Sequence, residues 1–149
     1  MVRVKLDMVI ARPIDGVFGR LTDLSDYARW MPKLGVFIRS GQTSEGPVGV
    51  GTTYYDKGWM GTFLGEIAEF HAPTRVAFTE TVEWLGVTVM EARPEYELVS
   101  TPSGTVVHHT AEGRLFGIFN VMKPLVAWMA RAERWRTVRA LKDSLEQGR

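Results

Sequence analysis

Cysteine is absent from the 149 residues of this chain. Its absence excludes disulfide bonds, thiolate nucleophiles, zinc sites built on cysteine and cysteine-held iron–sulfur clusters. A net charge of one sign is also missing, because 18 Lys/Arg against 17 Asp/Glu leave a formal charge of +1. A nucleic-acid-binding domain usually carries a larger, clustered excess of positive charge. We therefore expect no nucleic-acid partner.

Long hydrophobic runs are missing as well. The longest apolar stretch, residues 115–130, contains Asn120, Lys123 and Pro124 and falls short of the roughly 20 apolar residues that a bilayer requires. Residues 1–7 carry a charge at every second position, unlike a signal peptide. We expect a cytoplasmic protein without an integral membrane segment.

Charge is nevertheless distributed unevenly along the chain. Residues 118–149 hold seven Lys/Arg and three Asp/Glu, so that the rest of the chain is slightly acidic. A basic helix lying against a more acidic sheet explains this distribution. Attraction to an anionic ligand, or peripheral contact with a membrane surface, is the alternative.

The composition that is present is that of a globular protein. Hydrophobic residues make up 45% and charged residues 23%, close to the average for folded domains. A chain of this length buries roughly 70% of its surface on folding, enough for a substantial core. We expect one domain over residues 1–149.

Hydrophobic periodicity predicts the order of the elements. Strict alternation over residues 2–11 predicts a half-buried strand. Short helices are expected next, one with Pro13 in its first turn and one over residues 24–30. After residue 36 the period changes to two, and residues 41–47 are predicted to form a loop. Five further strands follow at 50–57, 60–70, 75–84, 87–99 and 105–116. Short turns between them predict an antiparallel meander.

The last segment returns to helical spacing. Its apolar stripe predicts a helix of about 25 residues lying across the sheet. The stripe contains Met122, Leu125, Val126, Met129, Ala130, Val138, Leu141 and Leu145. Glu133 falls within or beside this stripe.

The order of these elements, together with local motifs, resembles a known superfamily. The motifs are IARPIDGVF (10–18), LTDLSDYARWMP (21–32), VGVGT (48–52), EFHAPTRVAF (69–78), YELVSTPSGT (96–105) and ERWRTVRALK (133–142). They are similar to those of the START-related SRPBCC superfamily, in its polyketide cyclase/dehydrase and lipid-transport branch. The resemblance implies an α+β helix-grip (START-like) fold. In it, a curved antiparallel sheet of about seven strands has two short helices after strand 1 and a long C-terminal helix packed across it.

The same resemblance implies an internal cavity between the sheet and the long helix. Small residues within the sheet (Gly61, Gly65, Ala111, Gly113) leave volume there. Strand parity points the larger side chains of one sheet face into this space. The candidate ligand-binding residues are Trp30, Tyr54, Phe63, Ile67, Phe78, Tyr96, Leu98, His109, Met129 and Glu133.

Three titratable residues are candidates for chemistry in the cavity. His109 is predicted to point inward, with a neutral imidazole that can both donate and accept a hydrogen bond. Glu80 shares strand parity with Phe78, and Glu133 lies on the helix; a buried carboxylate of either would need a polar partner. His108 and His109 point to opposite faces, and no metal-ligand spacing occurs. We expect no metal and no cofactor.

These features favour binding, with possible transport, of a hydrophobic small molecule such as a lipid, quinone or polyketide. A cyclase or aromatase with His109, Glu80 or Glu133 as acid–base groups is the enzymatic alternative. Cyclases of this superfamily place arginine inside the cavity, whereas no inward strand position here carries one. Arg20, Arg29 and Arg131 lie on predicted helices or near the mouth. A protein-interaction module is the third hypothesis.

Overall fold

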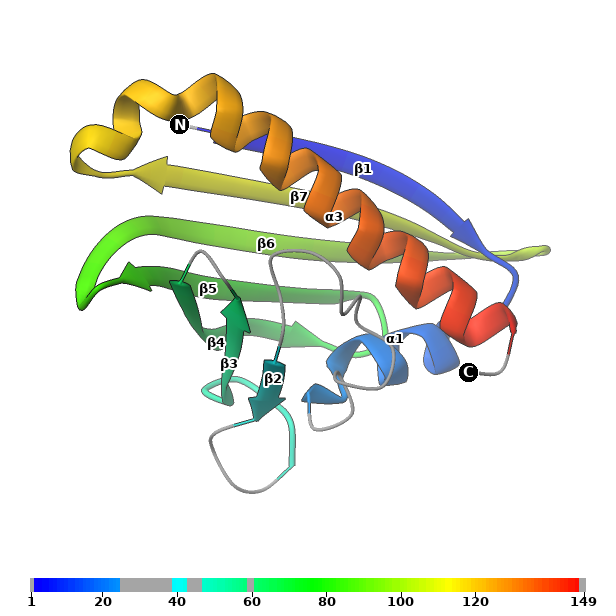
Figure 1. Cartoon of the computed structure of the whole chain (residues 1–149). Coiled ribbons are helices and arrows are strands. Elements are labelled where there is room, and N and C mark those ends of the chain that lie inside the picture. Colours follow the sequence, from blue (N-terminus) through cyan, green and yellow to red (C-terminus); the bar gives the residue numbers. More distant parts are fainter. Residues whose placement is uncertain (1, 25–38, 43–46, 59–60, 148–149) are drawn as a thin grey trace.

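The computed structural model describes residues 2–24, 39–42, 47–58 and 61–147 (Figure 1). The N-terminal part contains strand β1 (Val2–Ile10), helix α1 (Ile14–Thr22) and strand β2 (Arg39–Gln42). The middle contains β3 (Thr53–Gly58), β4 (Gly61–His71), β5 (Arg75–Trp84), β6 (Val87–Thr101) and β7 (Gly104–Leu115). A 3-10 helix, η2 (Gly117–Met122), leads into the long helix α3 (Lys123–Glu146).

Among the described residues, seven strands form one antiparallel sheet in the order β1-β7-β6-β5-β4-β3-β2. Strands β2 to β7 are a meander, and β1 joins the sheet by pairing with β7, with Val2 opposite Gly113 and Ile10 opposite Thr105. The β5–β6 connection is a two-residue turn in which both Leu85 and Gly86 have positive φ. Two positive-φ residues are what a tight hairpin turn requires.

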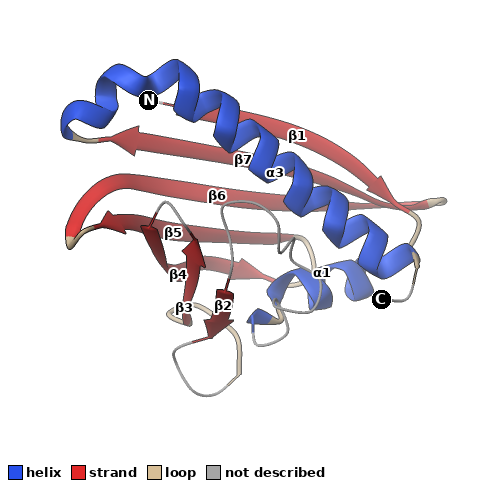
Figure 2. Cartoon of the chain, viewed as in Figure 1, coloured by secondary structure: helices blue, strands red, loops and turns tan. Residues whose placement is uncertain are grey.

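Helix α3 crosses one face of this sheet, and α1 lies beside its C-terminal end (Figure 2). Burial along β1 alternates strictly, because successive side chains of a strand point to opposite faces. The inward face of β1 is therefore covered by α3, and its outward face is exposed.

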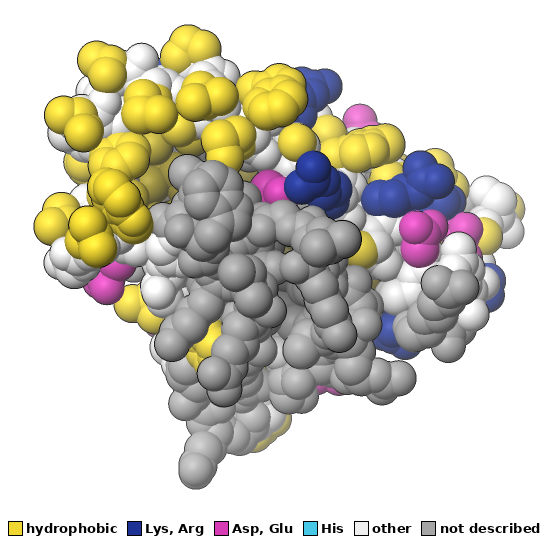
Figure 3. All heavy atoms as spheres, in the orientation of Figure 1, with side chains coloured by type: hydrophobic (Ala, Val, Ile, Leu, Met, Phe, Trp, Pro, Cys, Tyr) yellow, Lys and Arg dark blue, Asp and Glu magenta, His cyan; other side chains and the backbone are white. Residues whose placement is uncertain are grey.

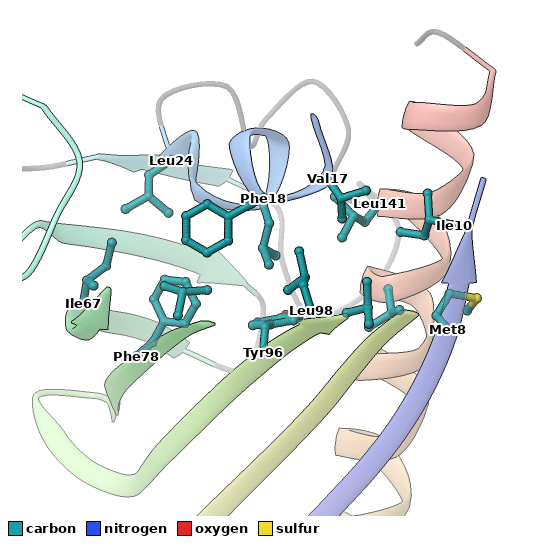
Figure 4. Packing of buried hydrophobic residues seen from close by; sticks show 14 of the residues in the cluster. Met8, Ile10, Val17, Phe18, Leu24, Ile67, Phe78, Tyr96, Leu98 and Leu141 are labelled. Atoms are coloured by element: carbon teal, nitrogen blue, oxygen red, sulfur yellow. The ribbon is translucent and has the colours of Figure 1, made fainter. Parts of the chain in front are cut away.

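The larger cluster of buried hydrophobic residues lies at one end of the space under α3 (Figure 4). Phe18 of α1, Leu98 of β6 and Leu141 of α3 meet there, and each is at least 96% buried. Phe18 contacts Phe70 edge to face, with ring centroids 5.3 Å apart. Helix α1 thus fills one end of the curved sheet with large side chains.

Polar contacts fix the same end of α3 to the strand beneath it. The carboxylate of Glu146 accepts a hydrogen bond from the Ala11 N–H at 2.9 Å. Arg12 donates to the Glu146 carbonyl at 2.8 Å, and the Lys142 ammonium donates to the Val9 carbonyl at 2.6 Å. The C-terminal turns of α3 are therefore anchored to the end of β1.

The structure confirms the α+β class, the curved antiparallel sheet and the long C-terminal helix, and it corrects two details. Strand β2 begins at Arg39 and includes Gly41 and Gln42, where the turn-rich composition predicted a loop. Residues 117–122 form the unpredicted helix η2. The second short helix predicted at 24–30 lies, apart from Leu24, outside the described residues.

The apolar stripe of α3 is buried only in its C-terminal half. Val138 and Leu141 are 1% exposed, whereas Met122 is 39% and Leu125 49% exposed. The prediction of one continuous buried stripe is wrong for the first turns, because the helix there extends beyond the packed core. No helix in the described part of the chain has the length and apolar character needed to span a membrane.

Candidate ligand-binding site

A cavity of about 130 Å³ lies between the N-terminal half of α3 and the sheet. Its walls are mostly apolar, from Val2 and Val4 of β1 to Phe119 of η2 and Met129 of α3. It lies at the end of α3 that is opposite to the packed core.

The cavity exists because the facing side chains are small. Ala92 is opposite Gly113 on neighbouring strands, and Pro94 is opposite Ala111. Ala130 of α3 faces them across the cavity. Side chains of this size cannot bridge the distance between a helix and a sheet, so space is left between them.

Gly65, which was expected to add to this volume, has a different role. A Cβ built on Gly65 would lie 2.2 Å from Cζ of Tyr54, which is closer than real atoms approach. The missing side chain makes room for the Tyr54 ring on the adjacent strand.

Two buried carboxylates are part of the mostly apolar cavity wall, which also includes the partly exposed Glu112. Glu80 of β5 is 6% exposed, and Glu133 of α3 is 8% exposed. Glu80 accepts a hydrogen bond from the Tyr54 hydroxyl. Glu133 accepts one from the Arg136 guanidinium at 2.6 Å. Each carboxylate thus has the polar partner that burial demands, and each keeps an edge toward the cavity.

Arg134 also lines the cavity, and the sequence analysis missed it. Arg134 follows Val126 and Ala130 at intervals of four, so all three occupy one face of the helix. That spacing was a readable signal. It was overlooked because only strand positions, and Arg20, Arg29 and Arg131, were considered as sources of an inward arginine.

His109 is fully buried and points inward, but it is not among the residues that line the cavity. It lies on β7 two residues from Ala111, which does line it. Its ring stacks on Tyr96 with centroids 4.1 Å apart. Its Nδ1 donates to the Glu95 carbonyl at 2.9 Å.

The environment of His109 fixes its protonation. A carbonyl only accepts, so Nδ1 carries the hydrogen and Nε2 keeps a lone pair, which has no hydrogen-bond partner among the described residues. Burial, and secondarily the positive charge of Arg134, lower the pKa of His109 to about 3. The imidazole is therefore neutral near pH 7, and its Nε2 is a buried acceptor.

The predicted site residues divide into two groups. Phe63, Met129 and Glu133 line the cavity, together with the catalytic candidate Glu80. Five other candidates pack in the core cluster, namely Tyr54, Ile67, Phe78, Tyr96 and Leu98. His109 lies between the cavity and this cluster. Trp30 lies outside the described residues. Strand parity indicated the inward face, but part of that face packs against α1 in the core cluster.

A scan against protein-family models matches residues 1–146 to the family described as polyketide cyclase / dehydrase and lipid transport. The chain belongs to this family. The resemblance deduced from the sequence motifs is thereby confirmed. No curated protein matches the chain by sequence.

Solved structures of low sequence identity share the fold of this family member. The di-domain ARO/CYC protein StfQ of the steffimycin biosynthetic pathway has a TM-score of 0.75 and 10% identity, covering 98% of this chain and 51% of StfQ. A Nitrosomonas europaea protein has a TM-score of 0.71 and 22% identity, covering 99% and 96%. Aha1 from Colwellia psychrerythraea, solved as a dimer, has a TM-score of 0.70 and 16% identity, covering 100% and 99%. At such identities the likeness concerns the fold alone.

Proposed function

We propose that this family member binds a hydrophobic small molecule, such as a lipid, quinone or polyketide, in the cavity under α3. The observation that carries the proposal is an apolar cavity whose wall includes two buried carboxylates and one arginine. Ligand sites are typically apolar, with a few polar groups that fix orientation. A solid core at this end of α3 would have needed none of these groups.

The polar groups restrict how a ligand lies. Glu80 and Glu133 can accept hydrogen bonds from a ligand hydroxyl, and Arg134 can donate to a carbonyl or an acidic oxygen. The apolar part of the ligand then lies against Val4, Met129 and their neighbours. The ligand is accordingly amphipathic, with one compact polar group.

The cavity volume limits the part of the ligand that is enclosed. A dry cavity of roughly 150 Å³ holds a benzene-sized molecule, and the volume here is about 130 Å³. One ring or a short alkyl segment therefore fits inside. A longer ligand extends out of the cavity.

Ligand binding can be tested with a matched pair of substitutions on β7. Ala111→Phe places a ring in the cavity, whereas Thr110→Phe places the same ring on the outer face one residue away. We expect a fluorescent fatty acid to bind the parent protein and Thr110→Phe alike, and Ala111→Phe at least tenfold more weakly. Native mass spectrometry should detect co-purified ligand on the parent protein and on Thr110→Phe, and less of it on Ala111→Phe. Equal probe affinity in all three proteins would contradict the proposal.

A cyclase-type enzyme is the second candidate, and the position of Arg134 favours it. Arg134 adds a cation to the cavity wall near two carboxylates, a set that could polarise a ketone and move a proton. The test is incubation with a poly-β-ketone substrate, followed by the absorbance of an aromatic product. Glu80→Gln should abolish turnover while probe binding is retained. Absence of turnover in the parent protein excludes this candidate and leaves the binding proposal intact.

A further inference from the structure

Large apolar side chains are exposed beside the cavity. They come from the β5–β6 turn and from η2 with the first turns of α3. We call them the apolar rim: Trp84, Leu85, Val87, Ile118, Val121, Met122, Leu125 and Trp128. Leu85 is 84% and Val121 83% exposed. Hydrophobic side chains cover this side of the molecule in Figure 3. Soluble monomers seldom expose so many large apolar residues in one region, and such patches mark interaction sites.

Direct contacts join the two parts of the rim to each other and to the cavity. The Trp84 ring meets Phe119 edge to face, with centroids 5.8 Å apart. Phe119 in turn lines the cavity. The N–H of Phe116 donates to the Val89 carbonyl at 3.0 Å, which ties the start of η2 to β6. The rim is thus continuous with the cavity wall.

Charge next to the η2 and α3 part of the rim is mostly positive, whereas Glu83 precedes Trp84 in the β5 part. Residues 115–130 contain one charged side chain, Lys123. Farther along α3 follow Arg131, Arg134, Arg136, Arg139 and Lys142, with Glu133 as the one acidic residue between 118 and 142. That acid is buried and paired with Arg136. Figure 3 shows Lys and Arg side chains beyond the hydrophobic area, along α3.

Tryptophan and arginine also share the exposed face of α3. Trp128 is 70% and Trp135 45% exposed, seven residues apart on one face of the helix. Arg131 and Arg139 occupy positions of the same face, and both are exposed. Tryptophan favours the boundary between lipid and water, and cationic side chains are attracted by anionic headgroups.

We propose that the apolar rim docks on an anionic lipid bilayer, with the cavity mouth toward the lipid and the cations of α3 at the headgroups. The proposal rests on the proposed function, because it makes the bilayer the source or destination of the ligand in the cavity. A second copy of this chain fits less well. A symmetric dimer through the rim would bring the cationic α3 helices together, whereas an anionic bilayer supplies the opposite charge. A protein covering the rim would also close the mouth.

Vesicle co-sedimentation tests the docking. The probe is phosphatidylcholine vesicles with and without 25% phosphatidylserine. We expect the parent protein to sediment with the anionic vesicles. In 0.5 M salt the bound fraction should fall at least fivefold, since salt screens the attraction between surface charges. Fluorescence of the exposed tryptophans should shift to shorter wavelength on binding. A protein that stays in the supernatant with both vesicle types overturns the proposal.

Substitutions at exposed positions locate the contact. Leu85→Asp combined with Val121→Asp should weaken vesicle binding at least tenfold; aspartate tolerates the positive φ at position 85. The matched control is Val99→Asp, on a 50% exposed valine of β6 outside the rim, which should bind as the parent does. Equal loss in the rim variant and the control, or in neither, overturns the assignment to the rim.

Two further measurements separate this proposal from the proposed function and from dimerisation. The rim variant should bind the soluble fatty-acid probe normally, whereas Ala111→Phe should lose the probe and keep vesicle binding. If probe binding is present and vesicle binding is absent, the docking fails and the ligand site survives. A dimer in analytical ultracentrifugation that the rim variant dissociates would assign the rim to a second copy and overturn the lipid proposal.

Discussion

Helix α3 is packed against the sheet at its C-terminal end and stands away from it at its N-terminal end. At the packed end, Val138 and Leu141 are 1% exposed, and three polar contacts fix the helix to the end of β1. At the other end the helix covers a cavity, and Leu125 and Trp128 face solvent. One helix thus supplies cohesion at one end and an accessible apolar surface at the other.

The difference between the two ends is a difference of side-chain size. Inward positions at the packed end carry Ile10, Leu98 and Val107, which fill the space under α3 and beside α1. Inward positions at the open end carry Ala92, Ala111 and other small residues. Burial of apolar surface is the main favourable contribution to folding, so the open end contributes less stability and has space for a ligand.

The largest expected effect is a loss of unfolding free energy when a side chain at the packed end of α3 is shortened. Leu141→Ala should lower the free energy of unfolding by about 2–5 kcal/mol, the usual cost of a large-to-small change in a tight core. Val126→Ala, on the same helix, should cost less than about 1 kcal/mol because Val126 is only partly buried and borders the cavity. Urea denaturation of both variants measures the contrast. Equal losses would mean that the two ends are packed alike.

An intermediate effect is expected from His109, which lies between the two ends. Burial lowers its pKa in the folded protein to about 3, whereas the unfolded chain binds the proton near pH 6.5. Falling pH therefore favours the unfolded chain between about pH 6.5 and 3, by roughly 1.4 kcal/mol per pH unit. From pH 7 to pH 5 this histidine should remove about 2 kcal/mol of stability.

The control for this pH dependence is His109→Asn. Asparagine can still donate to the Glu95 carbonyl but does not titrate in this range. Denaturation curves at pH 7 and pH 5 should show a smaller acid loss in the variant, by about the 2 kcal/mol that linkage assigns to the histidine. An identical acid loss in both proteins would show that His109 is not shielded from protons.

The smallest effect is expected from the polar clamp at the packed end. The hydrogen bond from the Ala11 N–H, then that from Lys142, lowers the pKa of Glu146. The stability that the ionised Glu146 contributes is present above pH 4.5, the pKa of this group in the unfolded chain. It is lost as pH falls below that value. Because Glu146 is near the surface, Glu146→Gln should cost no more than about 1 kcal/mol at pH 7. The control is Asp143→Asn, at a carboxylate that forms an ion pair with the exposed Arg139 at 3.6 Å, and it should change stability less.

The sequence predicted the fold better than the site. The alternation in β1, the turn at Leu85-Gly86 and the helical stripe of α3 are local signals, and each element formed where its signal lies. The inward residues that line a cavity depend on where α1 packs. The sequence of the strands does not indicate this position. Tyr96 and Leu98 were therefore assigned to the cavity, although α1 and α3 cover them.

Periodicity also could not distinguish burial from exposure at a mouth. Leu125 and Val126 obey the same helical spacing as Leu141, yet only Leu141 meets a packed layer. Arg134 was missed for a different reason, because only strand positions and three other arginines were considered as sources of an inward arginine. The helices and strands could be predicted from local sequence, whereas the site depends on how these elements pack together.

The pairing of β1 with β7 has a consequence for the nascent chain. Strands β2 to β7 can pair with their sequence neighbours as they leave the ribosome, but β1 must wait for a partner about 100 residues downstream. Contacts so distant in sequence form slowly. Val2 and Val4, which line the cavity, are thus synthesised before β7 but reach their positions in the sheet only after β7 has formed. The cavity forms only after β7 and α3 have been synthesised, so ligand binding follows the pairing of β1 and cannot guide the earlier steps of folding.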